Sequence, residues 1–173
     1  MRLLDLLERA EALEQRTAAL YRGFADARRD DSELAALWTA MAADEDDHAR
    51  SIREARHGLS ALDVETVSVE GCDAALAEIA QRLRHAEKLR GDAASDRQFS
   101  AALDLELSEL EAIRQLTLQA SHQLSVPVPG EAHLQRLADT AMRRSQDGHV
   151  RLGAALLLAR ARLAADAAAR RPG

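Results

Sequence analysis

Apolar residues recur every three or four positions along most of this chain, a spacing typical of amphipathic α-helices. Between residues 58 and 71 the period fades, and Val64, Val67 and Val69 alternate with polar residues, a weak indication of extended chain. The pattern predicts five helices, which cover about residues 3–28, 33–56, 73–90, 96–123 and 131–168.

Turn chemistry separates the predicted helices. Asp30-Asp31-Ser32 interrupts the first pattern and supplies an N-cap for the second helix. Such a short connection between two long helices predicts an antiparallel hairpin, and residues 125–130, which are rich in Pro and Gly, predict a second one. We therefore expect a single domain over residues 1–173, with hairpins at about 3–56 and 96–168 joined by a long, partly helical crossover at about 58–95.

Composition supports an all-α fold and excludes several function classes. Hydrophobic residues reach 47% and aromatic residues only 2%, and an apolar content dominated by Ala and Leu favours helix over strand. The net charge of −6 leaves no broad basic face for nucleic acid, and the single cysteine excludes an internal disulfide or a paired-cysteine metal knuckle. The longest apolar run, residues 154–159, is far below the roughly 20 residues that span a bilayer. With no signal peptide before the first helix, we expect a cytoplasmic protein.

Acidic residues and a histidine interrupt the apolar faces of the first hairpin. Glu45 and His48 project side by side from the same helix face as Met41. Glu14 lies in the middle of the apolar face of the first helix, and it is about as far before Asp30 as Glu45 is after it. The hairpin therefore brings the two glutamates level. Because burying a carboxylate without a partner is costly, we expect a metal ion between them.

The second hairpin repeats this arrangement in part. Glu106 lies on an apolar face with Phe99 and Leu103, and Glu109 lies beside it. On the last predicted helix, Leu134, Ala138, Met142 and Leu156 place His149 on the inner face, with Gln146 three residues before it. The other histidines fall near helix ends or polar faces, so we expect them to be solvated: His57, His85, His122 and His133.

In their order, Glu14, Glu45-x-x-His48, Glu106 and Gln146-x-x-His149 resemble the ligands of the ferritin-like superfamily, and specifically of the rubrerythrin-type di-iron domain. Tyr21, two turns after Glu14, fits the family pattern in which a phenol hydrogen-bonds toward the site, and Glu106-Leu-Ser-Glu109 resembles the paired glutamates of rubrerythrins. The resemblance covers about residues 3–56 and 96–160. It implies a ferritin-like four-helix bundle with one long crossover.

The resemblance also implies a carboxylate-bridged di-iron centre, although this ligand type accepts manganese or zinc as well. Gln146 replaces one bridging carboxylate, so two divalent ions would reach four carboxylates only if Glu109 turned inward. The alternative is a single metal held by Glu14, Glu45 and His48. No rubredoxin-like cysteine pair follows the bundle, so we expect an external electron donor.

Three functions remain open on this evidence. The resemblance implies a peroxide- or oxygen-linked redox enzyme, a rubrerythrin-like peroxidase or ferroxidase, acting as a homodimer. Iron binding or delivery without turnover is the second reading. The third is a metal-free helical bundle that serves as an interaction module with a decayed site, and the substitution at Gln146 supports it.

Overall fold

The computed structural model of the protein describes residues 2–59, 71–91, 94–119 and 131–169. The predicted extended segment with Val64, Val67 and Val69 lies outside these residues, as does the predicted end of the fourth helix at residue 123.

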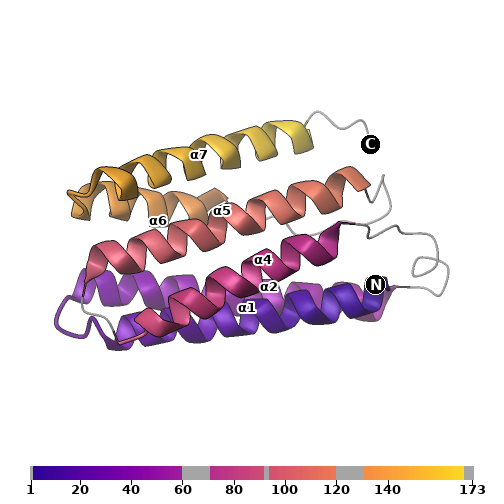
Figure 1. Ribbon diagram of the computed structural model, residues 1–173, viewed down its shortest axis with the longest axis horizontal. Coiled ribbons are helices and arrows are strands. Elements are labelled where there is room, and N and C mark those ends of the chain that lie inside the picture. The colour runs from indigo at the N-terminus through magenta and orange to yellow at the C-terminus, as the bar shows by residue number, and fades with distance from the viewer. Residues whose placement is uncertain (1, 60–70, 92–93, 120–130, 170–173) are drawn as a thin grey trace.

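All regular structure in the described residues is helical, which confirms the predicted all-α class. The long helices run along the long axis of the molecule, and the start of α1 and the end of α7 lie toward the same end (Figure 1). The elements are α1 (Leu3–Asp26), α2 (Ser32–Gly58), α4 (Cys72–Ala86), the short 3-10 helix η1 (Glu87–Leu89), α5 (Ser95–Gln119), α6 (Glu131–Arg144) and α7 (Gly148–Ala169).

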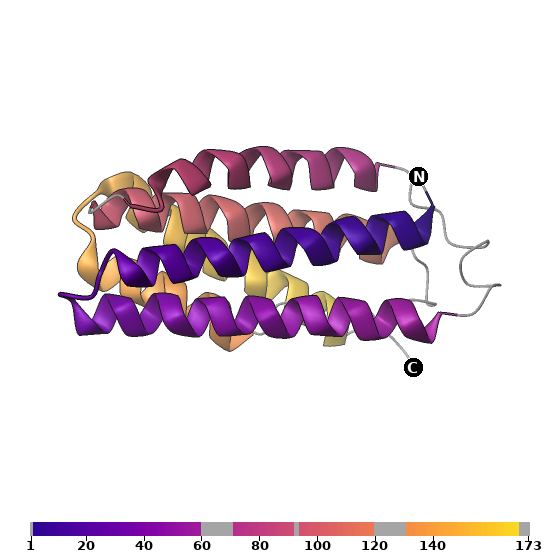
Figure 2. The same ribbon diagram turned by 90° about the horizontal axis from the view of Figure 1, so that it is seen from below.

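Helices α1 and α2 form the predicted antiparallel hairpin, in which they lie side by side over most of their length (Figure 2). The carboxylate of Asp31 accepts a hydrogen bond of 3.2 Å from the backbone N–H of Leu34, so the predicted N-cap is confirmed. Farther along the pair, Arg53 of α2 contacts Glu11 of α1 at 2.7 Å. The hairpin therefore fixes which residues of α1 and α2 are level with each other.

Helix α4 packs against α5 and α1. Its buried face contains no carboxylate, as the sequence predicted, and Glu78 and His85 are exposed. This helix contributes apolar packing to the core and no polar group to the cluster described below. Its buried residues are Cys72, Leu76, Ile79, Leu83 and Ala86.

The prediction of one continuous helix over residues 131–168 is wrong. The chain leaves helical geometry at residues 145–147, and α7 then runs back along α6 and α5 (Figure 1). Local polar groups explain the break: the hydroxyl of Ser145 accepts from the backbone N–H of Asp147 at 3.0 Å, and the carboxylate of Asp147 accepts from the N–H of His149 at 2.7 Å. These bonds end one helix and cap the next.

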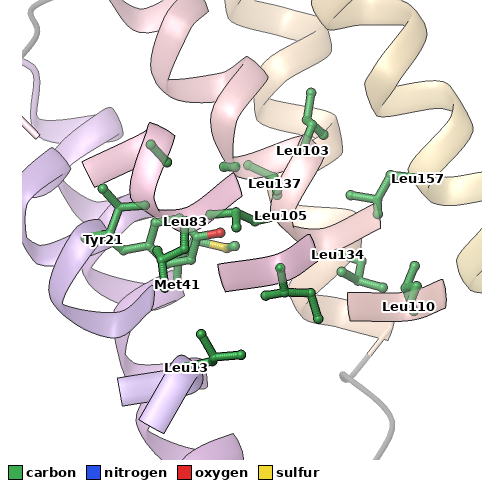
Figure 3. Packing of buried hydrophobic residues seen from close by; sticks show 14 of the residues in the cluster. Leu13, Tyr21, Met41, Leu83, Leu103, Leu105, Leu110, Leu134, Leu137 and Leu157 are labelled. Carbon is green, nitrogen blue, oxygen red and sulfur yellow. The ribbon is translucent and has the colours of Figure 1, made fainter. Parts of the chain in front are cut away.

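The hydrophobic core is continuous through the molecule and takes residues from every long helix (Figure 3). Four fully buried aromatic rings lie together in it, with Trp38 at the centre. Its ring centroid is 5.7 Å from Tyr21, 5.2 Å from Phe24 and 5.5 Å from Phe99. Because these rings belong to α1, α2 and α5, they hold the three helices in a fixed relation.

The large hydrophobic residues that are exposed in the described part of the chain all lie on α7. Leu152 is 68% exposed, Leu156 44% and Leu163 69%. Even so, none of the described helices is both long enough and apolar enough to cross a membrane.

Candidate metal centre

Six side chains that can bind a cation converge in the interior from four helices. Glu14 comes from α1, Glu45 and His48 from α2, Glu106 and Glu109 from α5, and His133 from α6. The first five were predicted from the sequence as site residues.

Glu45 lies at the centre of this cluster, and each of its carboxylate oxygens faces a different histidine. Oε2 is 3.1 Å from Nδ1 of His48, and Oε1 is 3.5 Å from Nε2 of His133. Nδ1 of His48 is also 3.8 Å from Oε2 of Glu14, and Nε2 of His133 is 3.1 Å from Oε1 of Glu106. The cluster therefore contains two overlapping groups that share Glu45.

Within each group the candidate ligand atoms all lie within 4.8 Å of one another. The two groups are Glu14, Glu45 and His48, and Glu45, Glu106 and His133. One carboxylate or imidazole atom from each residue can thus reach a common point, which is the geometric requirement for holding a metal ion.

Polar atoms without a hydrogen-bond partner are concentrated in this cluster. Six buried side-chain atoms in the described part of the chain make no hydrogen bond, and four of them belong to the cluster: Glu14 Oε2, Glu45 Oε1, Glu106 Oε2 and His133 Nε2. Glu45, Glu106 and His133 are at most 3% exposed. Because a buried polar atom without a partner costs stability, these residues fit a bound cation, which would give all four atoms a partner.

Two glutamates of the cluster hold protons strongly. Burial, together with the charges of Glu106, Glu109 and Glu14, raises the pKa of Glu45 well above its usual range. Burial and the charges of Glu14 and Glu106 raise the pKa of Glu109 in the same way. Glu109 is only 6% exposed, so the structure places this carboxylate inside, as a fourth member beside Glu14, Glu45 and Glu106.

Glu106 and His133 shift in the opposite sense, toward an ion pair. Burial by itself raises the pKa of Glu106, but the charge and close contact of His133 and the hydrogen bond from Tyr21 bring that pKa below its usual value. Burial lowers the pKa of His133, and the charges and contacts of Glu106 and Asp44 overcome this effect and raise it to about 9. The metal-free cluster is thus partly neutralised by protons.

Tyr21 lies against the cluster, on the side where the family resemblance implied a phenol. Its hydroxyl donates a hydrogen bond of 2.9 Å to Oε1 of Glu106, and both residues are fully buried. Burial and the charges of the neighbouring glutamates raise the pKa of this phenol well above its usual value. Tyr21 therefore stays protonated and acts as a donor to Glu106.

His133 is oriented by a residue outside the cluster. Its Nδ1 lies 3.0 Å from Oδ2 of Asp44, and the same carboxylate oxygen pairs with the guanidinium of Arg136. With Nδ1–H directed at Asp44, the ring would present the lone pair of Nε2 to a metal ion once the Nε2 proton is lost. A carboxylate behind a histidine commonly fixes the tautomer and orientation of a metal ligand.

The last two residues of the predicted ligand set, Gln146 and His149, do not lie in the cluster. Gln146 and His149 are both exposed and lie at the break between α6 and α7, so the prediction that they face inward fails with the prediction of a continuous helix. His133, which we expected to be solvated, is 3% exposed and takes the place predicted for His149.

A sequence signal for His133 did exist. On a helix it shares a face with Leu137 and Ala141, which are both fully buried. Its position near the start of the predicted helix concealed this signal, because histidines at helix ends are commonly solvated.

Comparisons with protein-family models, with curated proteins and with solved structures found no match to this chain. The function of this protein is therefore inferred from the cluster itself.

Proposed function

We propose that the cluster is a carboxylate-bridged centre for two divalent metal ions, of which iron is the first candidate. The observation that carries this proposal is the position of Glu45, whose two oxygens face two separate histidine and glutamate groups. A carboxylate in that position can bind one ion through each oxygen. One ion would be held by Glu14, Glu45 and His48, and the other by Glu45, Glu106 and His133.

Charge supports two ions better than one. Two divalent ions bring four positive charges, and the four inward carboxylates of Glu14, Glu45, Glu106 and Glu109 balance them once deprotonated. The exposed Gln146 no longer argues for a decayed site, because it lies outside the cluster. A single ion held by Glu14, Glu45 and His48 would leave the unpartnered atoms of Glu106 and His133 unexplained.

The function that such a centre supports best is peroxide- or oxygen-linked redox chemistry of the rubrerythrin type. When bound, a pair of iron ions supplies two electrons by passing from the ferrous to the ferric state. The chain's own residues hold and orient the ions, exclude bulk water from the buried half, and keep Tyr21 protonated beside Glu106. Repeated turnover requires electrons from outside, and we propose a separate donor protein as their source.

A second function, iron binding and delivery without turnover, is favoured by one observation. The side chains of Glu14 and His48 are 16% and 18% exposed, so an ion held there has a path to solvent. Oxidation of the ferrous protein by peroxide separates the two functions. If the protein is a redox enzyme, peroxide should oxidise the bound ferrous iron faster than buffer alone does. If it is a delivery protein, it should transfer its iron to a chelator or an acceptor.

The same proposal includes a ferritin-like arrangement and a cytoplasmic location. The four helices that supply the cluster, α1, α2, α5 and α6, would form the bundle, and α4 would belong to the crossover. The exposed leucines of α7 would pack against a second copy in a homodimer. Sedimentation should then give twice the 18.8 kDa mass of one chain, and Leu152→Lys should reduce it to the monomer without changing metal content.

The experiment that tests the metal centre is an anaerobic titration with ferrous iron. Wild type should bind about two ions per chain, and Glu45→Gln should lose both because it removes the shared ligand. Glu54→Gln is the matched control, since Glu54 lies on the same helix and is exposed. Binding of no iron by the folded wild type would overturn the proposal and favour the metal-free interaction module.

A further inference from the structure

The two halves of the cluster differ in their access to solvent. In the group with Glu14 and His48, both outer side chains are partly exposed, by 16% and 18%. In the group with Glu106 and His133 the side chains are 0% and 3% exposed. Water or a small molecule can therefore reach the first group directly, whereas the surrounding helices shield the side chains of the second group.

The two histidines also differ in how firmly they are held. His133 is held at Nδ1 by Asp44, whose carboxylate also pairs with Arg136, and its Nε2 lies 3.1 Å from Oε1 of Glu106. His48 contacts the cluster through Nδ1, and among the described residues no hydrogen bond involves its Nε2. Its ring can turn away from the cluster without breaking a bond on the outer side.

Both differences should make a bound ion easier to release from the group with Glu14 and His48 than from the group with Glu106 and His133. Release of a metal ion requires that water or another ligand replaces the protein ligands one at a time. A partly exposed group with an unsupported histidine allows this replacement, whereas a dry group with a histidine fixed by an outer carboxylate opposes it. Outer partners of this kind typically change metal affinity 10- to 100-fold.

We propose that the centre is divided into an exchangeable half at Glu14 and His48, where metal enters and leaves and small ligands reach the centre, and a retaining half at Glu106 and His133. Asp44 is the positioning residue of the retaining half. This inference rests on the proposed two-metal centre and deepens it. It assigns different tasks to two groups that share Glu45.

The test is the rate at which a chelator removes Zn²⁺ from the loaded full-length chain. We expect wild type to release two ions in two phases of equal amplitude that differ at least tenfold in rate. His48→Ala should remove the fast phase and leave the slow one. Asp44→Asn should accelerate the slow phase by about 10- to 100-fold and leave the fast phase unchanged.

Two further variants guard against a general loss of structure. Arg136→Gln removes the other contact of Asp44 and should accelerate the slow phase by a smaller factor. Asp47→Asn is the matched control, because Asp47 is an exposed aspartate on the same helix whose carboxylate pairs with the nearby Arg50, and it should change neither phase. Circular dichroism should show full helix content in each variant.

Different results overturn different claims. Two bound ions released in a single phase would overturn the division into halves and leave the two-metal centre standing. An Asp44→Asn variant that accelerates both phases equally, or that accelerates neither, would also overturn it. No bound Zn²⁺ in the folded wild type would overturn the metal centre and, with it, this inference.

Discussion

Replacing Glu45 with glutamine should stabilise the metal-free protein at neutral pH, against the usual effect of a change in the core. Burial and three neighbouring carboxylates raise the pKa of Glu45, so its carboxyl keeps a proton in the folded state at a pH where the unfolded chain has lost it. An unfolded glutamate loses its proton near pH 4.3. Above that pH the folded state binds more protons than the unfolded state, and stability falls as pH rises.

The size of the expected change in stability follows from this linkage between proton binding and folding. One retained proton lowers the free energy of unfolding by about 1.4 kcal/mol for each pH unit above the unfolded pKa, as long as the folded group stays protonated. Between pH 5 and pH 7 wild type should therefore lose stability steadily for as long as the folded Glu45 carboxyl keeps its proton. Glutamine has the shape and neutrality of the protonated carboxyl, so Glu45→Gln should match wild type near pH 4 and exceed it progressively toward pH 7.

The assay is urea unfolding of chelator-treated protein at several pH values between 4 and 7.5, followed by circular dichroism. The expected result is a shallower fall in stability with pH for Glu45→Gln, with Glu54→Gln as the exposed control that follows wild type. An equal or lower stability of Glu45→Gln at pH 7 would refute the reasoning, because it would mean that the Glu45 carboxylate is ionised and well satisfied without a metal.

Three further predictions concern the surroundings of the cluster. Tyr21→Phe removes a buried 2.9 Å hydrogen bond to Glu106 and should lower the free energy of unfolding by about 1.5–3 kcal/mol in denaturant titrations. Leu103→Ala, at a position 2% exposed, should cost about 2–5 kcal/mol, whereas Leu152→Ala, at a position 68% exposed, should stay within about 0.5 kcal/mol. Metal binding at pH 7 should release protons into weakly buffered solution, because two cluster glutamates and His133 hold protons. The apparent metal affinity should therefore rise with pH up to about 9. Metal binding without proton release would contradict the raised pKa values.

The first hairpin could be predicted from the sequence because its signals are local and agree with one another. Helical period, the Asp31 cap and the equal distance of Glu14 and Glu45 from the turn all specify the same packing. Once two helices are joined by a short turn, the register between them follows from counting residues. The sequence alone could thus predict that Glu45 and His48 lie in the interior.

The second half of the cluster depends on a break that helical period does not reveal. Ala and Leu continue the apolar pattern across residues 145–147, so periodicity favours one long helix. Hydrogen bonds from backbone N–H groups to the side chains of Ser145 and Asp147 outweigh this preference, and the chain reverses. The inward direction assigned to His149 depended on an unbroken helix and was therefore wrong.

The position of His133 depends on contacts between distant segments. Asp44, Glu45 and Glu106 surround its ring, and none of them is near it in sequence. A histidine close to a helix start has no local feature that reports such partners. The inward position of Glu109 is of the same kind, since its carboxylate lies near that of Glu14, which is distant in sequence.

The most direct measurement of the central claim is a crystal structure of the iron-loaded protein with anomalous diffraction data that locate the metal. The account predicts two anomalous peaks of similar height, one on each side of the Glu45 carboxylate and about 3.5–4 Å apart, as in other two-metal sites. His48 should lie next to one peak and His133 next to the other. A single peak, or peaks only at surface carboxylates, would contradict a dinuclear centre in this cluster.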